Sequence, residues 1–119
     1  VLRPDGWLAL YEVVAGPVGT PYYPTFWARS TATSFLAPPE ALRQILANAG
    51  FRELHWRDTS AWALEWLAAR RQALETTDGT RLTGLPLVLG AAFGAMAQNH
   101  ARNLREGRIR IVEGVVVRQ

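Results

Sequence analysis

Residues 2–14 of the 119-residue chain read LRPDGWLALYEVV, a turn followed by an apolar strand, and this stretch decides the fold. The Pro-Asp-Gly sequence at positions 4–6 is a turn signature, because Pro restricts φ and Gly tolerates backbone angles that other residues avoid. The run Gly6–Val14 is apolar apart from Glu12 and contains several good β-formers. Such a run predicts a strand buried on both faces, as in a sheet covered by helices.

Alternating helix and strand signals follow this first strand. Residues 15–37 combine Pro, Gly and aromatic residues without periodicity, and they predict a long loop. A helix is predicted over residues 38–49, since Pro38 suits the first turn and Glu40 opposes the positive end of the helix dipole. The remaining predicted elements are a strand at 51–58, a helix at 60–74, a loop at 76–84, a helix at 87–105 and a strand at 108–118.

The last predicted strand is apolar at both odd and even positions, which favours a central place in the sheet. The first two strands are expected to be parallel if a right-handed crossover joins them. The last strand then lies antiparallel between them. The sequence therefore predicts an α/β domain over residues 1–119, with a three-stranded mixed sheet in the chain order 1-3-2 and a helical cap over residues 60–105.

Composition excludes several classes of protein. The absence of Cys removes disulfides, thiol nucleophiles and Cys-type zinc sites, and it fits a cytoplasmic location. No apolar run has the length of a membrane span, so we expect no membrane partner. The net charge is +3, but the thirteen Arg residues are scattered along the chain, so we expect no nucleic-acid partner. A small basic nucleic-acid binder stays open as a third alternative.

Three segments resemble the C-terminal half of class I S-adenosylmethionine-dependent methyltransferases. Leu2–Leu10 is similar to the turn and fifth strand of that family, written L-K/R-P-G-G-x-L. Ser34–Phe51, with its Pro-Pro-Glu, is similar to the helix before the sixth strand. Asn103–Ile109 is similar to the entry to the seventh, antiparallel strand. The resemblance covers almost the whole chain and is nearest to the small-molecule branch, which includes sarcosine, tocopherol and quinone-precursor methyltransferases.

The resemblance implies a partial Rossmann-like fold. The family's Gly-rich loop after its first strand, and the acid that binds the ribose, have no counterpart in these 119 residues. We therefore expect S-adenosylmethionine, the cofactor of the intact family, not to be bound by this chain alone, and we assign no catalytic residue. The expected partners are a small-molecule methyl acceptor and, at the exposed first strand, either a missing N-terminal half or a second copy in a homo-oligomer such as a dimer.

The first candidate substrate-binding residue is Glu12, near the C-terminal end of the first strand, where open α/β sheets place their ligands. In the resembling family an acid near this position can face a cationic amine. The alternative is a carboxylate that is solvated or paired with Arg. Tyr22, Tyr23 and Trp27 lie in the aromatic loop, which either covers an apolar or cationic substrate or packs on its own domain.

Two further candidates, Asn99 and Asn103, lie one turn apart on the last helix, where they either bind a substrate or face solvent. Between them His100 falls on the apolar stripe, which favours a hydrogen-bonded core histidine over a general base. His55 has no partner at metal-ligand spacing, so no metal site is expected. Trp62 and Trp66, at i and i+4, predict a packing seam rather than a cofactor-binding site.

Two functions are consistent with the sequence. The first is the substrate-side, C-terminal part of a S-adenosylmethionine-dependent small-molecule methyltransferase, inactive by itself. The alternative is a non-catalytic module derived from that fold, which self-associates through the first strand and binds a small ligand or another protein.

Overall fold

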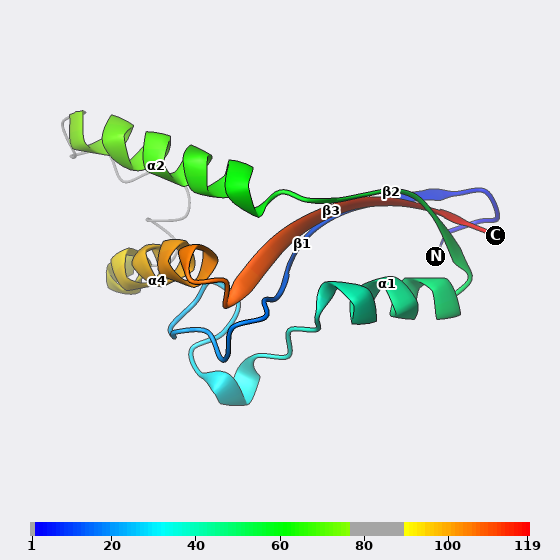
Figure 1. Cartoon of the computed structure of the whole chain (residues 1–119), viewed down its shortest axis with the longest axis horizontal. Helices are drawn as coiled ribbons and strands as arrows, with labels where there is room; N and C mark the ends of the chain where they lie inside the picture. The colour runs from blue at the N-terminus through cyan, green and yellow to red at the C-terminus, as the bar shows by residue number, and fades with distance from the viewer. Residues whose placement is uncertain (1, 77–89) are drawn as a thin grey trace.

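The computed structural model describes residues 2–76 and 90–119, in which a curved three-stranded sheet carries helices on both faces (Figure 1). The elements follow the predicted order. The predicted loop at 76–84 and the start of the predicted helix at 87–89 lie, apart from Thr76, outside the described residues. The elements are β1 (Trp7–Ala15), the 3₁₀ turn η1 (Thr31–Thr33), α1 (Pro39–Asn48), β2 (Phe51–Asp58), α2 (Ser60–Thr76), the 3₁₀ turn η2 (Gly90–Ala92), α4 (Phe93–Arg105) and β3 (Ile109–Arg118).

The strand order is β1-β3-β2, so the central position predicted for the last strand is confirmed. Trp7 of β1 lies opposite Val117 of β3, and Ala15 lies opposite Ile109. β2 pairs with the other edge of β3 and is also antiparallel to it. The predicted antiparallel orientation of the last strand between two strands that run in the same direction is thus confirmed. The description of the sheet as mixed is wrong, because β1 and β2 do not pair with each other and both pairs of neighbouring strands are antiparallel.

The turn before β1 forms as predicted, and Asp5 adopts a φ of 61° in it. This left-handed conformation disfavours most side chains, but Asp tolerates it better than most because its short polar side chain can bond locally. Asp5 occupies the position at which the resembling family's pattern has its first Gly. Asp5 thus adopts the left-handed conformation that a Gly at this position would also allow.

The core lies where α2 and α4 cover one face of the sheet. Ile109 and Ile111 of β3 pack there against Ala63 of α2 and Leu104 of α4. Since successive side chains of a strand alternate between faces, Val116 points to the opposite face, where it meets α1. The two layers of helices thus cover different faces and different ends of the sheet (Figure 1).

On the α1 face, the ring of Trp56 in β2 occupies the space that a side chain at position 114 of the central strand β3 would fill. A Cβ added at Gly114 would lie 2.8 Å from Cε3 of Trp56, which is closer than real Cβ atoms approach, and 3.0 Å from Cζ3. Gly114 therefore makes room for the indole of the neighbouring strand. Arg43 of α1 stacks over the same ring, 5.5 Å from its centroid.

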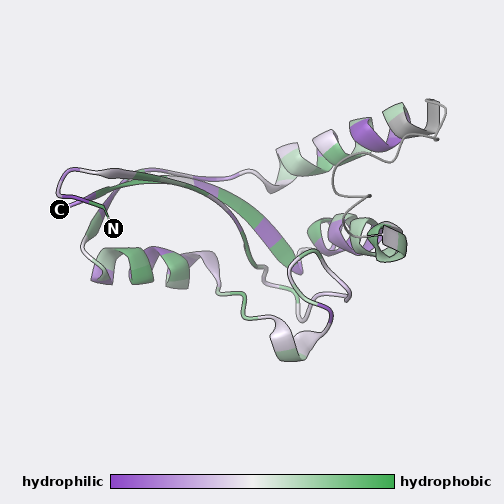
Figure 2. Cartoon of the chain, turned by 180° about the vertical axis from the view of Figure 1, so that it is seen from behind, coloured by the Kyte–Doolittle hydropathy of each residue, from purple (hydrophilic) through white to green (hydrophobic). Residues whose placement is uncertain are grey.

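The expectation that the first strand is buried on both faces is wrong. Trp7 is 69% exposed and Tyr11 is 55% exposed, and Val14 is the one residue of β1 in the buried core. Within the described residues, β1 pairs with no strand other than β3. Its outer edge meets the segment before α1 at the end of the strand, where the Ala15 N–H donates to the Ala37 carbonyl at 2.9 Å. Apolar residues thus continue along the strands beyond the part packed by α2 and α4 (Figure 2).

The predicted packing contact of α2 is also wrong. Trp62 is 58% exposed and Trp66 is 49% exposed, and the ring of Trp66 stacks with Arg70 one turn later. The i, i+4 spacing aligned the two side chains correctly, but the face that carries them is turned away from α4 and the sheet.

None of the helices in the described ranges 2–76 and 90–119 combines the length and the apolar character that a membrane span requires.

Candidate functional site

The candidate site is built on the corner where α4 ends and β3 begins. Gly107 ends the helix with a φ of 72°, a conformation that favours Gly. Two residues before the corner turn inward: Asn103 has no exposed surface and Leu104 is 2% exposed. Gly16, just after β1, approaches the corner so closely that a Cβ there would lie 2.1 Å from the Gly107 carbonyl oxygen.

The chain that leaves β1 runs along this corner and is bound to it by its backbone. The Gly16 N–H donates to the Arg108 carbonyl at 2.9 Å, and the Val18 N–H donates to the Gly107 carbonyl at 3.1 Å. The Arg108 guanidinium then donates to the Thr20 carbonyl at 2.8 Å. These bonds continue the β1–β3 pairing beyond the ends of the two strands.

The amide side chains of α4 hold the next part of the same loop. The Tyr22 N–H donates to Asn103 Oδ1 at 2.8 Å, and Asn103 Nδ2 donates to the Tyr22 carbonyl at 3.1 Å. One turn earlier, Asn99 Nδ2 donates to the Pro24 carbonyl at 3.0 Å. The structure thus brings the sequence candidates Tyr22, Asn99 and Asn103 together, and the amides of both Asn residues bind the loop backbone.

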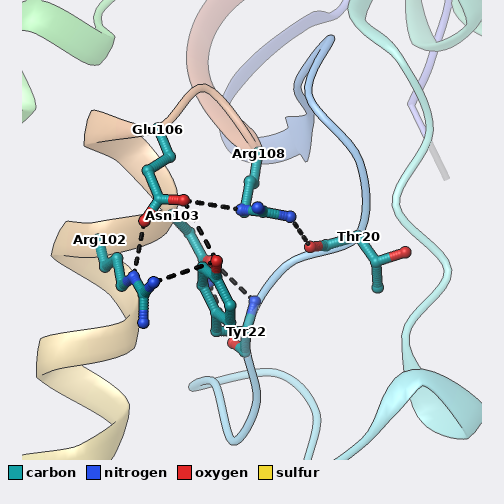
Figure 3. Close-up of polar contacts among 6 residues, drawn as sticks. All are labelled: Thr20, Tyr22, Arg102, Asn103, Glu106 and Arg108. Carbon is teal, nitrogen blue, oxygen red and sulfur yellow. Dashed lines mark hydrogen bonds and ion pairs between the residues drawn. The ribbon is translucent and has the colours of Figure 1, made fainter.

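The Tyr22 ring lies between two guanidinium groups (Figure 3). Cζ of Arg102 is 3.8 Å from the ring centroid and Cζ of Arg108 is 4.4 Å from it. The phenol oxygen accepts a hydrogen bond from Arg102 at 3.1 Å and donates one to Glu106 at 3.3 Å. Both Arg residues also donate to Glu106, and the bond from Arg102, followed by the one from Arg108, lowers the pKa of that carboxyl.

The aromatic residues of the loop form its tip. Thr25 and Ala28 close a tight turn in which the Thr25 N–H and Oγ1 both donate to the Ala28 carbonyl, at 2.8 and 3.0 Å. The turn directs two rings at α4: Phe26 lies 5.4 Å from the His100 ring and Trp27 lies 6.3 Å from it. The aromatic loop therefore packs on its own domain, which was one of the two interpretations of the sequence.

His100 is held in an apolar environment. Its Nδ1 is buried and has no hydrogen-bond partner in the described part of the chain, and burial lowers the pKa of the imidazole. The position on the packed side of α4 agrees with the sequence, but the expected hydrogen bond is not present at this nitrogen. A buried polar atom without a partner costs about 1–3 kcal/mol.

Trp27 and Tyr23 complete the predicted aromatic set. The Trp27 indole N–H donates to Ser34 Oγ at 3.0 Å, so Trp27 also connects the tip to the segment before α1. Tyr23 is half-buried beside the loop residues that bind α4.

Glu12 lies apart from this cluster. Its side chain is exposed and, among the residues described, makes no hydrogen bond or ion pair. It borders an open groove of about 590 Å³ along the outer edge of β1. The groove is otherwise mostly apolar, and its other lining residues include Leu8, Leu10, Val14, Leu36, Leu42 and Leu46.

Sequence reasoning did not identify Arg102, Glu106 and Arg108 as part of the site. Arg102 and Glu106 have the i, i+4 spacing of a helical ion pair, which is a weak signal, since such pairs are common on exposed helices. Their link to Tyr22 was not visible because about eighty residues separate them along the chain. Among residues 2–76 and 90–119, no group of three or more His, Asp or Glu side chains has the arrangement of a metal site.

Comparisons with known proteins identify the fold. No family model and no curated protein sequence matches the chain. The solved structures similar to it include phosphoethanolamine N-methyltransferase 2 of Haemonchus contortus, in complex with phosphomonomethylethanolamine and S-adenosylhomocysteine, with a TM-score of 0.69 and 14% identity. They also include the cyclopropane synthase MmaA2 of Mycobacterium tuberculosis, at 0.64 and 15%, and the [4+2]-cyclase SpnF, at 0.55 and 22%.

Each of these matches covers 98% of this chain but only part of the other protein. The chain spans 27% of the Haemonchus protein, 41% of the cyclase and 46% of the cyclopropane synthase. Its fold is therefore similar to part of a class I S-adenosylmethionine-dependent methyltransferase fold, as the sequence predicted.

The described residues do not fit the cofactor of that fold. Backbone N–H groups at a helix N-terminus are the usual partners of such a nucleotide-like group. α1 begins with Pro38 and Pro39, which have no N–H, and at the start of α2 the Ser60 N–H is bound by Asp58 Oδ1 at 2.8 Å. Within the described residues, no Gly-rich loop directly precedes α1 or α2.

Proposed function

We propose that this chain forms the acceptor-binding part of a S-adenosylmethionine-dependent small-molecule methyltransferase and transfers no methyl group by itself. One observation carries the proposal: the similarity to methyltransferase folds extends over 98% of the chain but over less than half of each of the three proteins described above. In this proposal the aromatic loop and Glu12 near the end of β1 belong to the acceptor side, and the described residues include no Gly-rich cofactor loop between a strand and a helix.

The acceptor is a small molecule with a cationic amine. Glu12, near the C-terminal end of β1, has no hydrogen bond or ion pair among the described residues, and aromatic rings favour cations by about 0.5–2 kcal/mol. The phosphomonomethylethanolamine bound by the Haemonchus protein carries such an amine and is a suitable first probe. The cofactor-binding part docks on the outer edge of β1, where no strand of the described residues pairs with it and where the Ala15 N–H, at the end of the strand, donates to the Ala37 carbonyl at 2.9 Å.

The cofactor part of the proposal is tested by isothermal titration of the chain with S-adenosylmethionine and S-adenosylhomocysteine. We expect no heat of binding, because among the described residues no Gly-rich loop leads directly from a strand into a helix. Saturable binding in the micromolar range would contradict the proposal, since the chain would then possess a cofactor site of its own.

The acceptor part is tested by NMR titration with phosphomonomethylethanolamine. We expect shifts in residues around Glu12, and at least a tenfold loss of affinity in Glu12→Gln. Glu40→Gln on α1 is a matched control, since Glu40 is also an exposed carboxylate. If the two variants bind phosphomonomethylethanolamine with equal affinity, Glu12 is not part of the acceptor site.

A specific observation also favours the alternative, a self-associating module. The free edge of β1 is accompanied by two exposed aromatic residues, Trp7 and Tyr11, on one face. Sedimentation equilibrium should then detect a dimer that Tyr11→Lys weakens and Trp62→Lys, on the exposed face of α2, leaves unchanged. A chain that is monomeric at the highest soluble concentration would exclude this alternative.

A further inference from the structure

The loop after β1 is anchored at every second residue from 16 to 24. Gly16 and Val18 bind through their N–H groups, Thr20 and Pro24 through their carbonyls, and Tyr22 through both. All the bonding partners belong to α4 or to the turn that leads into β3. We call residues 16–24 the anchored segment.

Asn103 is the central anchor. It is fully buried, and one carboxamide satisfies both backbone groups of Tyr22. The flanking anchors hold the loop less firmly. Asn99 makes one hydrogen bond to it, and Arg108 binds the Thr20 carbonyl with a side chain that is 22% exposed. A buried amide with two satisfied bonds is costly to break, because both backbone groups would be left without partners.

The tip of the loop is packed on the same helix as the anchors. Phe26 contacts Phe93 and His100, with ring centroids 5.9 and 5.4 Å apart, and Trp27 contacts His100 from the side. A movement of the tip away from α4 would break these ring contacts. A movement of the anchored segment would in addition break the bonds of Asn103 and Asn99.

We propose that Asn103 is the positioning residue of the acceptor site: it fixes the anchored segment to α4, so that the aromatic tip moves together with α4 and does not open alone. The part of this inference that concerns acceptor binding rests on the proposed function, whereas the coupling of loop and helix does not.

The geometry explains why this position carries Asn. A carboxamide offers one acceptor and one donor at adjacent atoms, which matches the N–H and carbonyl of a single residue. Asp has the acceptor without the donor, and Gln places both atoms one bond farther from the helix. The sequence Asn103-Leu104-x-x-Gly107 thus combines the anchor, a core residue and the helix end.

The two histidines provide the test. In NMR spectra, His100 should show ring-current shifts from Phe26 and Trp27 and a pKa below 6.5, because the rings shield it from water. In Asn103→Ala we expect the ring-current shift to be lost and the pKa to rise toward 6.5. The His55 signal, from β2, reports whether the sheet remains folded.

Two control variants separate this effect from general destabilisation. Val116→Ala lowers stability from the other face of the sheet, and Asn48→Ala removes an exposed amide at the end of α1. Both should leave the His100 signals unchanged. If Asn103→Ala does not fold, Asn103→Asp, which keeps the acceptor, and Asn99→Ala are measured in its place. Unchanged His100 signals in the folded anchor variants, or equal changes in the controls, would overturn the coupling.

The link to acceptor binding has a separate readout. In a folded Asn103→Asp variant, affinity for phosphomonomethylethanolamine should fall at least threefold, and Asn48→Ala should bind like the unmodified chain. Loss of the His100 shift with unchanged affinity would overturn the positioning role and leave the coupling intact. If the unmodified chain does not bind this probe at all, the proposed acceptor site fails, and the histidine titration still decides the coupling.

Discussion

β1 and β3 are both apolar strands of similar length, yet they differ in burial. β3 has buried residues on both faces, among them Ile109, Ile111, Val112 and Val116, whereas in β1 only Val14 is buried. β3 is flanked by a strand on each side and covered by helices at both ends. The apolar composition of a strand therefore does not by itself show that its side chains are buried. The position of the strand in the sheet decides whether other parts of this chain pack over them.

The same contrast separates the two ends of the molecule. At the α4 end, long-range hydrogen bonds and buried residues join the loop, the helix and the strand into one unit. At the α1 end, the side-chain links between helix and sheet include an ion pair of Arg43 and Glu53, whose side chains are 45% and 36% exposed. The α1 end and the edge of β1 are therefore the parts of the surface suited to a partner.

The largest expected effect compares the two strands directly. Ile109→Ala should lower the free energy of unfolding by about 2–5 kcal/mol, because it leaves a cavity in the core at a residue with no exposed surface. Tyr11→Ala should cost less than about 1 kcal/mol, because its side chain is mostly in water. Urea denaturation measures both. Similar losses would mean that β1 is covered in solution, and the contrast between the strands would fail.

A second substitution tests the packing on the α1 face. Gly114→Ala should destabilise the protein by about 1–3 kcal/mol, because the new methyl group collides with the Trp56 ring. In the double variant with Trp56→Leu, the loss caused by the Ala should be smaller. If the two substitutions are additive in thermal denaturation, the Trp56 ring does not lie over Gly114.

The third prediction concerns the pH dependence of the α4 end. Because burial lowers the pKa of His100 in the folded protein, the unfolded chain binds a proton first as the pH falls. The stabilisation is complete above pH 6.5, the ordinary value, and is lost as the pH falls from there to the folded-state pKa. The carboxyls with lowered pKa, Glu106 and Glu113, act in a separate window below 4.5.

His100→Leu should therefore flatten the pH dependence of stability just below pH 6.5. It should leave unchanged the loss of stability below pH 4.5, where the carboxyls titrate. Denaturant titrations at several pH values provide the measurement. A variant with the same slope as the unmodified chain in the upper window would show that another group titrates there.

The smallest expected effect belongs to the α1 end. Arg43→Ala removes two hydrogen bonds of 2.8 Å to Glu53 and the stacking on Trp56. We expect a loss of about 0–1 kcal/mol that shrinks at high salt, because the pair is solvated. A loss as large as that of Ile109→Ala would show that α1 is held as firmly as α4.

Most of the fold was predictable from local patterns, and the site was predictable only in part. Pro38 and Pro39 at the start of α1, and the apolar residues at both odd and even positions of β3, located their elements correctly. Among the candidates, Tyr22, Asn99 and Asn103 do meet, but their contacts join residues 75 to 81 positions apart, which no local pattern encodes. Their role in binding an acceptor stays a prediction, as does that of Glu12.

The sequence by itself determined the order of helices and strands and the central place of β3, because periodicity and turn residues act over a few neighbouring positions. Only the tertiary structure decided which apolar surfaces are covered and which polar groups find partners. Burial and hydrogen bonding depend on segments brought together from distant parts of the chain. For that reason Asn103 is a buried anchor and Trp7 an exposed ring, although the sequence alone indicated a polar helix position and a buried strand.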